Sequence, residues 1–128
     1  MKNRDVYGLA LALLAENGDR TENGDYEERA GYLLAAFCSE ILSVNRRLCE
    51  AEGVPAVTRV PIYLSLDEEL PVRESLSAAA GAYLAAMLVL EEDADLSDRL
   101  FSRYCDAISG ICAGLPMRSE VIADRYGI

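Results

Sequence analysis

Apolar residues recur along most of this chain at the three- and four-residue spacing that is typical of amphipathic helices. The pattern predicts four helices, within residues 1–17, 26–52, 71–91 and 96–114. The third is apolar around most of its circumference, which indicates a buried central helix. The links after the first and third helices are short, and short links favour antiparallel neighbours. The pattern therefore predicts a single all-α domain over residues 1–128, a four-helix antiparallel bundle.

The helical pattern is interrupted between residues 54 and 70, where β-prone residues alternate with turn residues. Pro55 and Pro61 lie in this segment, so a strand here would be short or would lie at a sheet edge. We expect an irregular joint, with at most a short β-like strand, between the second and third helices. Pro71 suits the first position of the third helix, where the N–H that proline lacks is not needed. We expect residues 117–128 to be a short C-terminal tail.

Capping residues predict where two of the helices begin and where one ends. Asp25 and Glu28 have the spacing of a capping box at the start of the second helix. Gly53 suits the end of that helix, because glycine readily adopts the left-handed conformation found there. Asp93 or Asp95 is expected to cap the fourth helix.

The joint ends in the stretch LDEEL, in which three carboxylates lie between Leu66 and Leu70. A catalytic carboxylate pair needs an apolar pocket to raise one pKa, and the neighbouring residues supply none. We expect Asp67 and the two glutamates to precede a helix N-terminus, where carboxylates are stabilised, and the leucines to point inward. Asn45 lies beside the apolar stripe of the second helix, and we expect its amide to bind the backbone of the joint.

The composition excludes most catalytic and metal chemistry. The chain contains no histidine, which rules out Ser-His-Asp and Cys-His triads. The stretch DADLSD lacks the glycine and the final acid of a calcium-binding loop. The four cysteines show no CxxC spacing and fall on helical stripes, so we expect buried, reduced thiols rather than a disulfide or a metal site. We therefore expect no enzyme activity, no metal and no cofactor. These cysteines are Cys38, Cys49, Cys105 and Cys112.

Twenty-two acidic against twelve basic residues give the chain a net charge of −10. This charge argues against binding to a nucleic acid, and it is compatible with solubility or with a basic protein partner. The most apolar segment, residues 76–90, is shorter than the about 20 residues of a membrane span. The N-terminus has no apolar run behind its charges, so we expect no secretory leader. No feature predicts a small-molecule substrate.

Several stretches together resemble the head–tail connector proteins (adaptor or head-completion proteins) of tailed phages and prophages in Gram-positive bacteria. They are VNRRL, VPIYLSLDEELPV, LEEDADLSD, LFSRYCDAI and the terminal VIADRYGI. The similarity runs from about Tyr26 to the end of the chain. It implies a helical subunit without enzymatic activity that forms a homo-oligomeric ring beneath the portal, to which the tail attaches. It also implies a protein found in the host cytoplasm during assembly and then in the virion.

The resemblance further implies two contact segments, because family members use extended arms and tails to reach neighbouring subunits. The expected partners are copies of the chain itself and the portal and tail proteins. An alternative interpretation, based on the charge, is a small acidic helical adaptor or inhibitor that binds a basic surface of a partner protein. An enzyme that uses carboxylates alone is a third possibility. The candidate contact residues are Arg59, Val60, Pro61, Ile62 and Tyr63 in the joint, and Val121, Ile122, Tyr126 and Ile128 in the tail.

Overall fold

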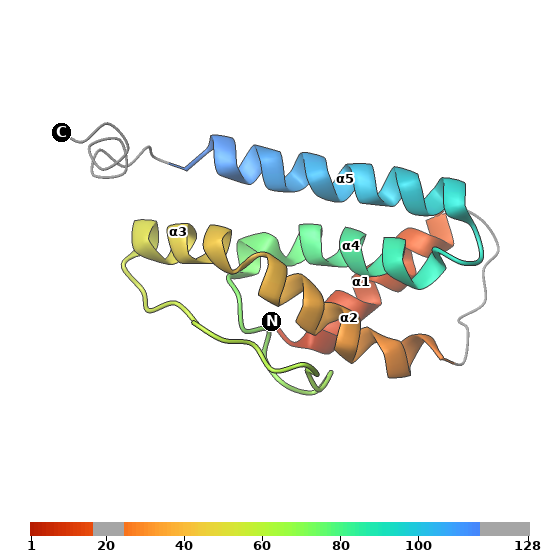
Figure 1. The fold of residues 1–128 in the computed structure, drawn as a ribbon, viewed down its shortest axis with the longest axis horizontal. Coiled ribbons are helices and arrows are strands. Elements are labelled where there is room, and N and C mark those ends of the chain that lie inside the picture. Colours follow the sequence, from red (N-terminus) through yellow and green to blue (C-terminus); the bar gives the residue numbers. More distant parts are fainter. Residues whose placement is uncertain (17–24, 116–128) are drawn as a thin grey trace.

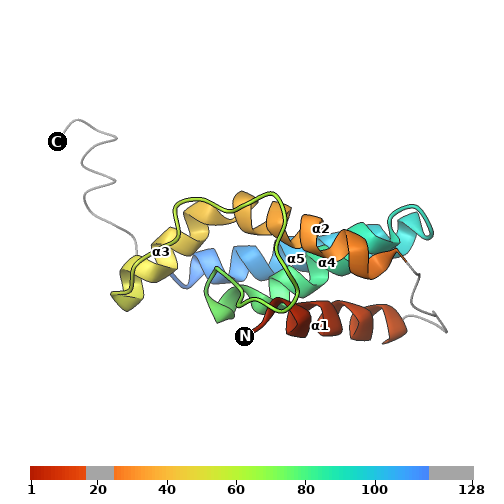
Figure 2. The same ribbon diagram turned by 90° about the horizontal axis from the view of Figure 1, so that it is seen from below.

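The fold is organised around one buried helix, α4 (Figures 1 and 2). The computed structural model describes residues 1–16 and 25–115. Within these residues α4 lies between α1, α2 and α5, and the chain forms helices but no named strand, so the all-α prediction is confirmed. The elements are α1 (Asn3–Glu16), α2 (Tyr26–Glu40), α3 (Leu42–Glu52), the 3-10 helix η1 (Glu74–Leu76), α4 (Ser77–Val89) and α5 (Ala94–Ala113).

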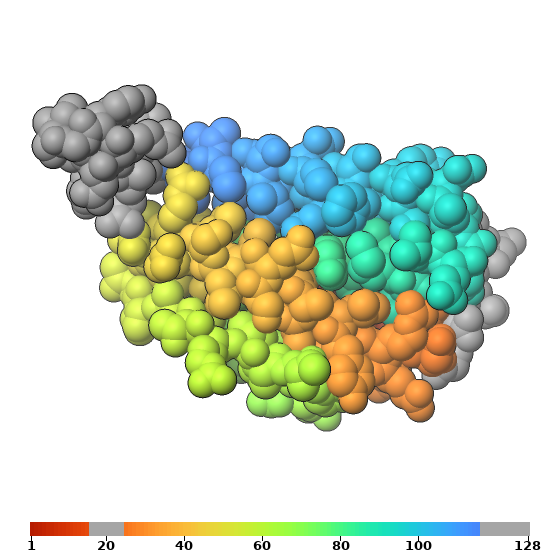
Figure 3. Space-filling view, viewed as in Figure 1, coloured from red at the N-terminus to blue at the C-terminus, as the bar shows by residue number. Residues whose placement is uncertain are grey.

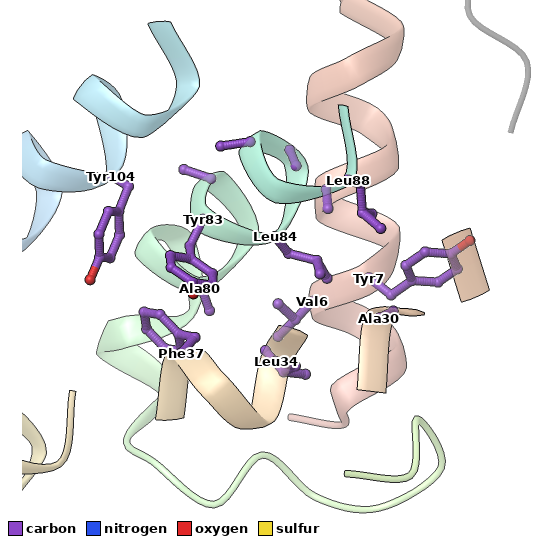
Figure 4. Close-up of a cluster of buried hydrophobic side chains, with 14 of the residues drawn as sticks. Val6, Tyr7, Ala30, Leu34, Phe37, Ala80, Tyr83, Leu84, Leu88 and Tyr104 are labelled. Atoms are coloured by element: carbon purple, nitrogen blue, oxygen red, sulfur yellow. The ribbon is translucent and has the colours of Figure 1, made fainter. Parts of the chain in front are cut away.

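The core forms where α1 and α2 meet α4. Val6 of α1, Leu34 of α2 and Leu84 of α4 are all completely buried and point toward one another (Figure 4). The alanines of α4 let its neighbours approach closely. At Gly81 a Cβ would lie only 2.6 Å from Cδ2 of Leu9 on α1, so a side chain at this position in α4 would require Leu9 to move.

Aromatic rings join α2 and α5 to the same central helix. The ring centroid of Tyr83 on α4 lies 5.6 Å from that of Phe37 on α2 and 5.3 Å from that of Tyr104 on α5. The Phe37 and Tyr104 rings meet edge to face at 6.0 Å, which completes the cluster (Figure 4). Burial, followed by the nearby Glu40 carboxylate, raises the pKa of Tyr104 to about 12. The three rings fix the position of α5 along α4.

The predicted second helix, residues 26–52, is wrong as a single helix. It breaks at Ile41, which has φ −96° and ψ 6°, and α3 continues in a new direction (Figure 1). No proline or glycine marks the break. Ile41, Asn45 and Cys49 are all buried, so α3 keeps its inner side against the rest of the chain after the break.

The predicted start of the third helix at Pro71 is also wrong. α4 begins at Ser77, and η1 precedes it. The expected capping box is absent as well, since Asp25 makes no side-chain bond to the N-terminal amides of α2. Its carboxylate instead lies 3.6 Å from the guanidinium of Arg29, one turn along the helix. The capping box fails because the Asp25 carboxylate pairs with Arg29 instead.

Two other predicted helix ends are correct. Asp93 Oδ1 accepts a hydrogen bond from the Leu96 N–H at 3.0 Å and so caps α5. Gly53 follows α3 with φ 71°, a left-handed conformation that favours glycine.

Tyr26 Oη donates a hydrogen bond to Glu92, so the start of α2 lies beside the turn between α4 and α5. α4 and α5 are antiparallel neighbours, as predicted (Figure 1).

The expectation that all four cysteines are buried is wrong for α5. Cys38 and Cys49 are buried, but Cys105 is exposed and Cys112 is only half-buried. The reason is that α5 packs chiefly on α4. One main neighbour covers only part of the apolar side of α5, so some apolar residues on that side stay exposed. Phe101 of α5 is likewise 38% exposed.

Thiol labelling at about pH 8 should therefore separate the cysteines into two classes. Cys105 should react rapidly in the native protein, whereas Cys38 and Cys49 should react only after unfolding. Burial also raises the pKa of the Cys38 thiol to about 12, which suppresses the reactive thiolate. Mass spectrometry of peptides after a timed maleimide pulse measures each site. Rapid native labelling of Cys38 would contradict the packing of α2 on α4.

Candidate protein-contact site

The segment after α3 crosses the surface as an extended arm, here defined as residues 54–64. It starts at the end of α3 and returns alongside α2, to which it is fixed where Leu64 N–H donates to Gly31 O at 3.1 Å (Figures 1 and 2). Between residues 55 and 63 no backbone group is hydrogen-bonded to another described residue. These groups are therefore available to water or to a partner.

The arm has an inner and an outer side. Val57 and Val60 are half-buried and pack against the core. On the outer side, Ile62 is 85% exposed and Tyr63 is 44% exposed. The Tyr63 ring lies 4.9 Å from that of Tyr32 on α2, edge to face. Tyr63 is therefore packed against α2, and both Tyr63 and Ile62 leave large apolar side chains exposed to water.

A hollow of about 360 Å³ lies between the arm and the outer side of α2. The two segments lie side by side on the face shown in Figure 3. The lining of the hollow carries no charge and consists mainly of apolar side chains. The lining residues and Tyr63, whose ring contacts Tyr32, are together called the arm face: Tyr32, Ala35, Ala36, Ser39, Val60, Pro61, Ile62 and Tyr63.

Gly31 explains why the arm can lie so close to α2. A Cβ at this position would lie 2.3 Å from Tyr63 Cε2 and 2.6 Å from the Leu64 carbonyl oxygen. Sequence analysis did not single out this residue. The available signal was a glycine inside a helical pattern, which costs about 1 kcal/mol relative to alanine and often indicates a close approach.

The rest of the joint binds the N-terminal segment. Backbone N–H groups of Asn3 and Arg4 donate to Glu68 O and Leu66 O at 2.9 and 2.8 Å, and Leu70 N–H donates to Met1 O at 2.8 Å. Leu66 and Leu70 are buried beneath this contact. Sequence analysis missed the partnership, because no local pattern links residues more than sixty positions apart.

The carboxylates of LDEEL do not cap a helix, which corrects that expectation. Asp67 lies 3.2 Å from the Arg4 guanidinium. Glu69 lies 3.1 Å from the Met1 ammonium, and Glu74 approaches the same ammonium at 2.7 Å. All three acids are exposed. Asp67 and Glu69 thus contact the N-terminal segment, and α4 begins too far along the chain to use them.

Asn45 ties α3 to the end of the joint. The side chain is 1% exposed, and its Oδ1 accepts a hydrogen bond from the Arg73 N–H at 2.9 Å. Arg73 Nε also lies 2.5 Å from Glu52 Oε2 on α3. The amide thus binds backbone, as expected, but its partner lies beyond Pro71 rather than directly after Gly53.

The contacts of the Met1 ammonium predict a pH dependence. The hydrogen bonds that this ammonium donates to Glu74 and then to Glu69 raise the pKa of the amine from 8.0, and the amine lowers the pKa of Glu74 from 4.5. The stabilisation from this contact should be lost as the pH rises through the raised pKa of the amine. It should also be lost as the pH falls through the lowered pKa of Glu74. The melting temperature should therefore fall more steeply above pH 8 in the native chain than in a Glu69→Gln/Glu74→Gln variant. Identical alkaline slopes would contradict this contact.

Among residues 1–16 and 25–115 no group of three or more histidine, cysteine, aspartate or glutamate side chains is placed to hold a metal ion. None of the described helices has both the length and the apolarity that crossing a membrane requires. The tail candidates Val121, Ile122, Tyr126 and Ile128 lie outside the described residues. Comparisons with models of protein families, with curated proteins and with solved structures found no match.

Proposed function

We propose that this chain is a non-enzymatic assembly subunit, similar to the head–tail connector proteins of tailed phages, that forms a ring between portal and tail. The observation that carries the proposal is the arm face, where Ile62 is 85% exposed beside an uncharged hollow. The proposed partners are copies of the chain and the portal and tail proteins, first in the host cytoplasm and then in the virion.

The arm supports this function because it can make contacts without unfolding any other element. Its backbone groups between residues 55 and 63 have no partner among the described residues, and both of its ends are fixed. Gly53 closes α3 at one end, and Leu64 is bonded to α2 at the other. An exposed segment with fixed ends loses less conformational entropy on binding than a free one.

Electron microscopy of the purified chain at high concentration, alone and with the portal protein encoded beside it, tests the proposal. We expect rings when the portal protein is present, and we expect Ile62→Glu to abolish them while the monomer keeps its helical circular dichroism spectrum. The absence of rings under both conditions, or a gene neighbourhood without capsid and portal genes, would contradict a connector role.

A second candidate function is an acidic adaptor or inhibitor. Exposed carboxylates gather at the turn between α4 and α5, where Glu91, Glu92, Asp95 and Asp98 all face solvent. Such a cluster attracts a basic protein surface, and the attraction weakens as salt rises. A 1:1 complex with one basic protein, lost on Glu91→Gln/Asp95→Asn/Asp98→Asn substitution but not on Ile62→Glu substitution, would favour this function over the connector.

A further inference from the structure

The acidic charge is distributed unevenly, and the arm face lies in a part of the chain that is balanced. Residues 30–66 contain three acids, Glu40, Glu50 and Glu52, and three basic residues, Arg46, Arg47 and Arg59, whereas the whole chain carries −10. Two copies of so acidic a chain repel each other over most orientations. The residues of the arm face itself are all uncharged, so two copies that meet there bring no acidic side chains of this face into direct contact, and the face offers none to a basic partner.

The arm face is also complementary to itself. Ile62 projects from the rim of the hollow that Tyr32, Ala36 and Pro61 help to line. In a two-fold dimer the same surface of both copies is in contact. An apolar side chain that lies beside an apolar recess can then fill the recess of the other copy. Each Ile62 then enters the hollow of the other copy, and the contact closes at two subunits.

We infer that the free chain forms a two-fold dimer through the arm face, with Ile62 of each copy seated in the hollow of its partner. This inference rests on the proposed function only in treating the arm face as a protein contact. A dimer of this kind covers Ile62 and Tyr63 before assembly. A connector ring can then form only after the dimer has dissociated, because the ring contact and the dimer contact both use the arm face.

Sedimentation equilibrium over a concentration series tests the inference. The mass should rise from 14.0 kDa to twice that value and then stop rising. Ile62→Glu should remain monomeric at every concentration, and its fold should persist because the side chain is 85% exposed. The matched control is Leu90→Glu, which places the same charge at a 48% exposed leucine outside the arm face and should leave dimerisation intact. Added salt should strengthen the dimer by screening like charges.

Cross-linking locates the contact directly. One copy carries Ile62→Cys and an affinity tag, the other carries Ala36→Cys, and both carry Cys105→Ser and Cys112→Ser. A short bismaleimide should link the two copies when they are mixed, whereas Leu90→Cys mixed with Ala36→Cys should stay unlinked.

Three results would overturn the inference. A chain that stays monomeric would remove the dimer and leave the connector role to the ring experiment. A mass that keeps rising beyond the dimer would replace the two-fold contact with a head-to-tail one. A dimer that persists in Ile62→Glu would place the contact on another surface. A closed dimer without rings beside the portal would instead support the inference and contradict the connector role.

Discussion

Replacing Leu66 with aspartate should lower the free energy of unfolding by about 2–4 kcal/mol, the range measured for removing a large buried apolar side chain. Leu66 is 4% exposed. The new carboxylate would be buried without a partner, which adds to the loss. The Leu66 carbonyl oxygen also accepts the N–H of Arg4 at 2.8 Å, so a displaced Leu66 would release the N-terminal segment. Urea unfolding followed by far-ultraviolet circular dichroism measures the change.

The neighbouring residue supplies the matched control. Asp67 has a side chain that is 78% exposed and a single ion pair with Arg4. Exposed ion pairs contribute about 0–1 kcal/mol, so Asp67→Asn should leave the unfolding midpoint almost unchanged. Leu70→Asp should behave like Leu66→Asp, since Leu70 is also buried. If the carboxylates prove critical and the leucines dispensable, the joint is a chemical site and not a structural one.

Gly31→Ala should detach the arm and destabilise the chain, even though alanine is the better helix former. In an unobstructed helix the substitution would gain about 1 kcal/mol. At this position the new Cβ would lie 2.6 Å from the Leu64 carbonyl oxygen, and backbone cannot rotate away as a side chain can. Overpacking of this kind typically costs about 1–3 kcal/mol. The Leu64 N–H, now bonded to Gly31 O, should exchange with solvent much faster.

Gly110→Ala on α5 is the control for this change. A Cβ at Gly110 meets no atom within 4 Å, so only helix propensity acts, and stability should rise by up to about 1 kcal/mol. Opposite signs for the two substitutions, read from denaturant midpoints and from hydrogen exchange at Leu64, would establish that the arm needs a glycine beneath it. Equal increases in stability for Gly31→Ala and Gly110→Ala would show that the arm is not packed closely against α2.

Local patterns predicted the elements that depend on local physics. The apolar repeat located α1, α4 and α5 to within a few residues, apart from the late start of α4, because amphipathic periodicity is a property of the segment itself. The Asp93 cap and the glycine after α3 were correct for the same reason, since each depends on groups within a few residues. The prolines correctly marked residues 54–70 as a break between helices.

The sequence by itself determined an all-α chain, its irregular joint, its buried leucines and its lack of histidine chemistry. Only the tertiary structure decided where α2 breaks, what the LDEEL acids bind and which cysteine is exposed. These features depend on groups distant in sequence: Asn45 of α3 binds the backbone of Arg73, Glu69 binds the Met1 ammonium, and α5 packs mainly on α4. The arm face belongs to the second group, because Gly31 and Tyr63 meet only after the chain has folded back on itself. Periodicity reports which side of a helix is apolar, but the number of neighbours that cover that side is a property of the assembled fold.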